Sequence, residues 1–102
     1  MSPTATERRF LDEAATALAA RPSSIQELRR FISTANAILE RLEESNDPVA
    51  SLLRSPLETF EEVYGVALYR GWAEVPASDL PVVREAVEEV RRALKSARHD
   101  PV

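Results

Sequence analysis

Two stripes of apolar residues, each recurring at alternating steps of three and four positions, constrain the fold of this chain more than any other feature. The first stripe consists of Ile25, Leu28, Ile32, Ala35, Leu39 and Leu42. The second consists of Leu80, Val83, Val87, Val90 and Leu94. This spacing places apolar side chains on one face of an α-helix, and such a face has to be buried against other helices. Phe31 and Ile38 broaden the first stripe, so we expect the helix that carries it to contact more than one neighbour.

Local signals predict where the helices begin and end. The clearest is a capping box, in which the Ser24 hydroxyl and the Glu27 carboxylate each accept a backbone N–H at a helix start. Pro22 is expected to end the preceding helix near Ala20, because proline disfavours helical backbone in the residue before it. Gly71 is expected to end another helix in the left-handed conformation. The expected helices run up to Ala20, over 25–44, 48–53 and 56–70, and from 80 to about 97.

These helices and the short links between them predict an all-α fold. The arrangement we expect is an antiparallel up-and-down four-helix bundle, with an additional short helix between helices two and three of the bundle. Asp47-Pro48 is predicted to start the short helix and Ser55-Pro56 the next one, since proline fits the first helical position. We expect a single helical-bundle domain over residues 1–102, with flexible ends at about 1–4 and 98–102.

The composition favours a cytoplasmic protein that does not bind nucleic acid. The formal net charge is −4, whereas nucleic-acid binding needs a basic face. A local patch of Arg29-Arg30 with Arg91-Arg92 is the alternative, if the helices that carry them lie side by side. We expect no membrane span, because no apolar run is long enough to cross a bilayer. We expect no secretory signal either, because the start of the chain lacks the apolar segment of a signal peptide. Twelve Arg against a single Lys, Lys95, are typical of a gene of high GC content and favour a bacterial source.

No set of residues suggests catalysis, a metal site or a cofactor site, so we expect a protein that is not an enzyme. There is no Cys, and His99, the only His, lies in the predicted tail, where nothing would fix it against a nucleophile. Two acidic clusters keep a carboxylate metal site open as an alternative. Each of them spans about one helical turn, and neither is followed by His at the expected spacing. The clusters are Glu40, Glu43 and Glu44, and Glu58, Glu61 and Glu62.

Aromatic residues gather near the end of the helix predicted over 56–70. Phe60, Tyr64, Tyr69 and Trp72 lie within thirteen positions, with Arg70 among them. Tyr, Trp and Arg are the residue types enriched at binding hot spots. Phe60 and Tyr64 share the face that a core would bury, so closure of the core is our first interpretation of this cluster. The alternative is a partner-binding site at the end of the helix, formed by its exposed members. The residues predicted to bind a partner protein are Tyr69, Arg70, Trp72 and Glu74.

The last helix offers a second possible interface. It carries a further edge of small and apolar residues beside its main stripe, and one edge would suffice for the core. The second edge could then pair with another copy of the chain in a two-fold dimer. The residues of this predicted self-association face are Val82, Ala86, Val90, Ala93 and Ala97. Gly65, inside a predicted helix, suggests close approach of another backbone from the same or another molecule.

In layout the chain resembles the bacteriocin-immunity proteins, small antiparallel four-helix bundles that neutralise a toxin by protein contact. The likeness rests on the long second helix, the link Asp47-Pro48-Val49 and the aromatic helix that follows it. The resemblance implies that the chain binds and neutralises a partner. The aromatic residues with Arg70, and the lack of an assembled catalytic set, lead us to expect a non-enzymatic adaptor or regulator. A toxin-neutralising protein and a self-associating structural dimer are the alternatives.

Overall fold

The computed structural model describes residues 5–97, and the ends predicted to be flexible, 1–4 and 98–102, lie outside this range. The described chain is all-helical, as predicted, and contains no strand. A 3₁₀ turn at Ala77–Asp79 precedes the last of four α-helices. The helices are α1 (Ala5–Ala20), α2 (Ile25–Glu44), α3 (Val49–Arg70) and α4 (Leu80–Ala97).

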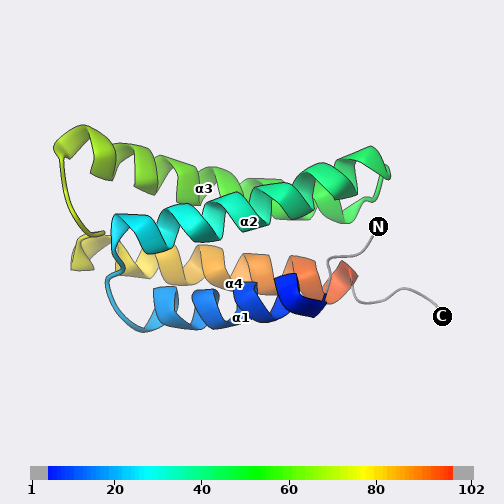
Figure 1. The fold of residues 1–102 in the computed structure, drawn as a ribbon, viewed down its shortest axis with the longest axis horizontal. Coiled ribbons are helices and arrows are strands. Elements are labelled where there is room, and N and C mark those ends of the chain that lie inside the picture. Colours follow the sequence, from blue (N-terminus) through cyan, green and yellow to red (C-terminus); the bar gives the residue numbers. More distant parts are fainter. Residues whose placement is uncertain (1–4, 98–102) are drawn as a thin grey trace.

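Each helix runs back alongside the one before it (Figure 1). The main packing partners are α1 with α2, α2 with α3, α3 with α4, and α4 with α1. Every helix therefore has two neighbours, and α2 and α4 lie diagonally opposite each other. The turns from α1 to α2 and from α3 to α4 lie at one end of the molecule, and the turn from α2 to α3 lies at the other.

The predicted extra helix between helices two and three is wrong as a separate element. Residues 49–53 form the first turns of α3, which continues without a break through Pro56. The start signal at Asp47 is real, because its Oδ1 accepts the Val49 N–H at 2.9 Å. Ser55-Pro56 starts no helix. Pro56 cannot donate a backbone hydrogen bond, but its ring is buried, and apolar burial favours the continuous helix.

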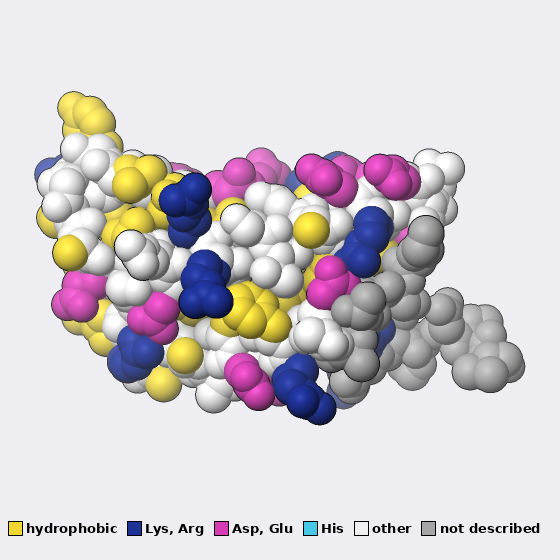
Figure 2. Space-filling view, viewed as in Figure 1, with side chains coloured by type: hydrophobic (Ala, Val, Ile, Leu, Met, Phe, Trp, Pro, Cys, Tyr) yellow, Lys and Arg dark blue, Asp and Glu magenta, His cyan; other side chains and the backbone are white. Residues whose placement is uncertain are grey.

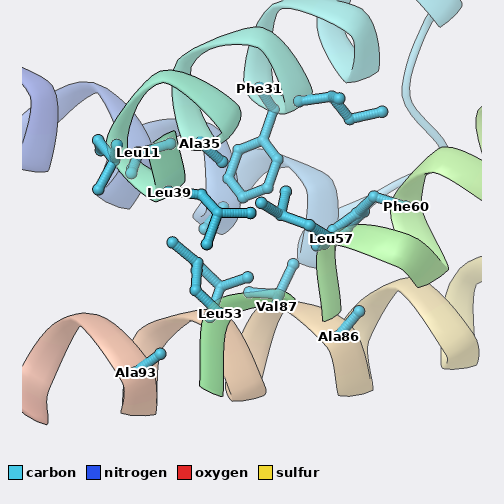
Figure 3. Close-up of a cluster of buried hydrophobic side chains, with 14 of the residues drawn as sticks. Leu11, Phe31, Ala35, Leu39, Leu53, Leu57, Phe60, Ala86, Val87 and Ala93 are labelled. Atoms are coloured by element: carbon cyan, nitrogen blue, oxygen red, sulfur yellow. The ribbon is translucent and has the colours of Figure 1, made fainter. Parts of the chain in front are cut away.

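The core lies between all four helices (Figure 3). The rings of Phe31 on α2 and Phe60 on α3 meet with their centroids 4.9 Å apart and their planes tilted by 60°. Aromatic pairs favour such tilted geometry over face-to-face stacking. Ile38 and Phe31 are buried together with all of the predicted stripe except Ile25, which is partly buried. The helix packs on both α1 and α3, so the prediction that it contacts more than one neighbour is confirmed.

The start of α2 follows the predicted capping box. The Ser24 hydroxyl accepts the Glu27 N–H at 3.1 Å, and the Glu27 carboxylate accepts the Ser24 N–H at 3.2 Å. Arg21 donates to the same carboxylate at 2.9 Å. The two reciprocal bonds satisfy backbone donors that a helix start otherwise leaves without a partner, which fixes α2 to begin at Ile25.

The substitution Phe60→Ala tests the central position of the aromatic pair. It removes a fully buried ring and leaves a cavity against Phe31, so we expect the free energy of unfolding to fall by about 3–5 kcal/mol. Leu52→Ala on the same helix is the matched control, because Leu52 is 55% exposed and its loss should change stability by less than about 0.5 kcal/mol. Urea denaturation followed by circular dichroism measures both values. Equal losses in the two variants would contradict this description of the core.

Candidate protein-interaction surface

The end of α3 is built by a glycine turn. Gly71 adopts the left-handed conformation with φ 70°, as predicted. Its N–H donates to the Leu68 carbonyl at 3.1 Å, and the Trp72 N–H donates to the Ala67 carbonyl at 2.9 Å. These bonds satisfy carbonyls of the last helical turn and reverse the chain sharply. Trp72 is thereby held beside the helix that it follows.

Two loops pair with each other immediately after this turn. The Ile25 N–H donates to the Ala73 carbonyl at 3.1 Å, and the Val75 N–H donates to the Ser23 carbonyl at 2.8 Å. Val75 is only 2% exposed and closes this end of the core. Trp72, which we considered for that role, is 39% exposed. Val75 was missed because it lies in a non-helical link, where no periodic pattern marks a buried position.

The structure divides the predicted aromatic cluster into two parts. Phe60 is fully buried and Tyr64 packs against the core. Tyr69 is 91% exposed, and Arg70 is exposed as well. The Arg70 guanidinium carbon lies 5.7 Å from the centroid of the Trp72 ring, within the range of a cation–π contact. The exposed members of the cluster therefore lie together where α3 ends.

Most of the large apolar side chains that are exposed on the described chain lie at this end of the molecule. Four of the six are within residues 66–72, and a fifth, Val82, is near the start of α4. Figure 2 shows hydrophobic side chains gathered at the end where α3 finishes. We call the four the α3 end patch: Val66, Leu68, Tyr69 and Trp72.

Glu74, the fourth residue predicted to bind a partner, is exposed in the loop beside this patch. Its charge also acts on Arg21 across the paired loops. The pKa of Arg21 is raised, first by its hydrogen bond to Glu27 and to a smaller extent by Glu74. The hydrogen bond from Arg21 in turn lowers the pKa of Glu27, and the Ser24 N–H adds to this effect. An ionic cluster therefore lies beside the α3 end patch.

The residues predicted for self-association lie mostly in the intramolecular core, against our expectation of a free edge. Ala86, Val90 and Ala93 are all buried, whereas Val82 is partly exposed. The side chain of Ala97 lies outside the described part of the structure. The reason is that α4 lies between α1 and α3, so that both of its apolar edges face a neighbouring helix.

Gly65 has no close neighbour in the described structure. A Cβ atom built on it would meet nothing within 4 Å. Of the two alternatives for a close neighbour, a helix of this chain is therefore excluded among the described residues. Gly65 lies on the exposed face of α3, next to the α3 end patch.

The paired arginines do not form a joint patch. Arg29-Arg30 on α2 and Arg91-Arg92 on α4 belong to diagonally opposite helices. Arg91 instead joins α4 to α1 by donating to the Thr16 hydroxyl at 2.7 Å, and Arg84 donates to the Ala19 carbonyl at 2.7 Å. A groove of about 510 Å³ lies beside Arg91 between the same two helices.

No group of three His, Cys, Asp or Glu residues arranged to hold an ion, the two acidic clusters included, occurs in residues 5–97. Glu43 forms an ion pair with Arg54 of α3 instead. His99 lies outside the described residues. None of the helices described is long and apolar enough to cross a membrane.

Comparison with known proteins does not assign the chain to a family. No family model matches the sequence, and neither the curated proteins nor the solved structures contain a significant match. The resemblance to bacteriocin-immunity proteins therefore stays a prediction, and its Asp47-Pro48 link leads directly into α3.

The two glycines give a matched test of the end of α3, since a Cβ would meet nothing within 4 Å at either position. Gly65→Ala should raise the free energy of unfolding by about 0.5–1 kcal/mol, because alanine is the better helix former. Gly71→Ala should lower it by about 1 kcal/mol, because a φ of 70° strains any residue with a Cβ. Thermal or urea denaturation measures both. Changes of the same sign would contradict the assigned backbone conformations.

The pKa of Glu27 gives a prediction of pH dependence. Because this pKa is lower in the folded chain, ionised Glu27 stabilises the fold above its ordinary pKa of 4.5, and this contribution is lost as the pH falls through the folded-state value. Glu27→Gln removes the charge but keeps an oxygen that can accept the Ser24 N–H. We expect the variant to be less stable by about 0.5 kcal/mol at neutral pH, a small value because the Glu27 side chain is 40% exposed. Urea denaturation across the acid range should show the difference disappear, and a constant difference would contradict the prediction.

Proposed function

We propose that this chain is a single antiparallel up-and-down four-helix bundle that acts, without catalysis, as an adaptor or regulator binding another protein. Its contact surface would be the α3 end patch with Arg70 and Glu74. The observation that carries the proposal is the gathering of exposed apolar side chains there, with Tyr69 91% exposed. A concentrated apolar patch of this kind is typical of a protein-interaction site, whereas single exposed apolar residues are ordinary.

The way in which the patch is held supports the proposal. The left-handed Gly71 and the hydrogen bonds between the Ile25–Ala73 and Val75–Ser23 backbones restrain the segment that carries Trp72. A surface that is ordered before it binds loses less conformational entropy on association, which favours affinity. The Arg70 guanidinium lies near the Trp72 ring, so the surface presents a cation and an aromatic ring together, and both residue types are enriched at binding hot spots.

A self-associating dimer through α4 has less support. Three of its expected contact residues are buried in the core, so Val82 is the only described member with substantial exposure. A toxin-neutralising role would be one form of the proposed protein binding, and nothing in the geometry favours it over other partners.

Site-specific photo-crosslinking tests the proposal. We expect a benzoylphenylalanine placed at position 69 to yield one discrete adduct on irradiation in the native cells. The same probe at position 92, an exposed position on α4, is the control and should not yield that adduct. The adduct at position 69 should be lost when Leu68→Ala and Trp72→Ala are added. Equal adducts from the two positions, or none from position 69, would refute the proposed surface.

A stability measurement separates contact surface from core. The triple substitution of Tyr69, Arg70 and Trp72 by Ala should retain the helical circular dichroism spectrum and lower the free energy of unfolding by less than about 1.5 kcal/mol, since these side chains are largely exposed. A loss as large as the one expected for Phe60→Ala would identify the cluster as core.

A further inference from the structure

The outward face of α3 has two halves of different chemistry, joined at Gly65. On the C-terminal side lies the α3 end patch, in which Leu68 and Tyr69 follow Gly65 by three and four residues. On the N-terminal side, Glu61 and Glu62 precede it by four and three residues. Residues at this spacing share one helix face. All five positions are exposed, so the acidic and apolar halves form one continuous strip.

The acidic half extends by another turn to Glu58, which is also exposed. Among the ion pairs of the described residues, none involves Glu58, Glu61 or Glu62. Arg54, the nearest cation before them on α3, is paired with Glu43 of α2. The three carboxylates lie within about one turn of one helix and form no ion pair within the described chain, so only solvent and dissolved ions screen their mutual repulsion.

Gly65 marks the point of closest possible approach on this strip. Its conformation is helical and a Cβ would have open space, so neither backbone geometry nor packing within the chain calls for glycine. Alanine would be the better helix former at such a position. The position is explained if a second helix crosses α3 there, because the absence of a side chain lets two helix backbones come close together.

A second copy of the chain fits the strip poorly. If two α3 helices crossed antiparallel at Gly65, Glu61 and Glu62 of one copy would face Leu68 and Tyr69 of the other. If they crossed parallel, the carboxylates would face each other. Both arrangements bury carboxylates without a cation, which is unfavourable. A partner that supplies its own basic residues satisfies both halves of the strip.

We propose that the strip binds an amphipathic helix of another protein, whose apolar residues pack on the α3 end patch and whose Lys or Arg residues pair with Glu58, Glu61 and Glu62. This inference rests on the proposed function and specifies its partner. The two helices cross at Gly65, and the charge pairing fixes which end of the partner helix lies over which half of α3.

Two kinds of variant test the crossing and the charge pairing. Gly65→Leu fills the crossing point, and we expect it to raise the melting temperature while weakening binding at least tenfold. Changing the three α3 carboxylates, Glu58, Glu61 and Glu62, to Gln should also weaken binding at least tenfold, and it should flatten the dependence of affinity on salt. If Gly65 had only a structural role, Gly65→Leu would not give a protein that is more stable and yet binds less well.

The control for the charge change is a second triple variant with the same net charge. It changes Glu40, Glu44 and Glu85 to Gln, three exposed carboxylates on α2 and α4. We expect it to alter binding less than threefold. Two readouts serve all variants. One is the dissociation constant of a synthetic amphipathic helix that carries leucines at one end of its binding face and lysines at the other end, and the second is the yield of the adduct formed from position 69. The same peptide with glutamates in place of lysines should not bind.

The outcomes separate this inference from the proposed function. Loss of both readouts in the Gly65→Leu and α3 carboxylate variants, with the control unaffected, supports a basic amphipathic helix as the partner. An adduct at position 69 that persists in both variants overturns the inference and leaves the proposed function standing. An adduct with the mass of two chains identifies a second copy and also overturns it. Equal weakening by the two carboxylate variants shows bulk attraction and refutes the site, and absence of any adduct refutes both proposals.

Discussion

The apolar contact between α2 and α3, centred on Phe31 and Phe60, is the interaction on which the rest of the structure depends. Both rings are fully buried, and each comes from the interior of a helix of 20 or more residues. Burying one such side chain contributes about 1.5–3 kcal/mol to stability. No polar contact in the described chain involves side chains that are both as large and as deeply buried as these two rings. Once α2 and α3 are joined, the remaining apolar faces of both helices can be covered only by α1 and α4.

The arrangement that results determines which surfaces are left for function. Because each helix has two neighbours, both apolar edges of α4 are used inside the molecule, and Ala86 and Ala93 are buried. The C-terminal end of α3, in contrast, keeps apolar side chains that are not used inside the molecule. Val75 closes the core there, so Trp72 is not needed for closure and stays partly exposed. The partial exposure of Trp72 thus follows from the way in which the core is closed at that end.

Local signals account for the parts of the fold that the sequence predicts correctly. The Ser24–Glu27 capping box and the glycine at position 71 act through hydrogen bonds to residues three to five positions away, so their effect is independent of distant packing. Phe60 and Tyr69 are nine residues apart, which is two and a half helical turns, and periodicity alone therefore places them on opposite faces of α3. The features that were missed depend on tertiary contacts. Pro56 continues a helix because its ring is buried, and Val75 is buried because two loops pair across the end of the molecule.

The exposed strip of α3 departs from what stability alone would favour. Local structure would favour alanine over Gly65, solubility would favour polar residues over Leu68 and Tyr69, and electrostatics would favour separating the carboxylates. Departures from such preferences in a folded domain concentrate where function, and not stability, determines the residue. Here they occur on consecutive turns of one face of one helix, while the buried side of the same turns follows the rules of core packing. A contact with a second molecule along this face would account for all three departures at once. It would occupy the space above Gly65, cover the apolar side chains and bring cations to the carboxylates.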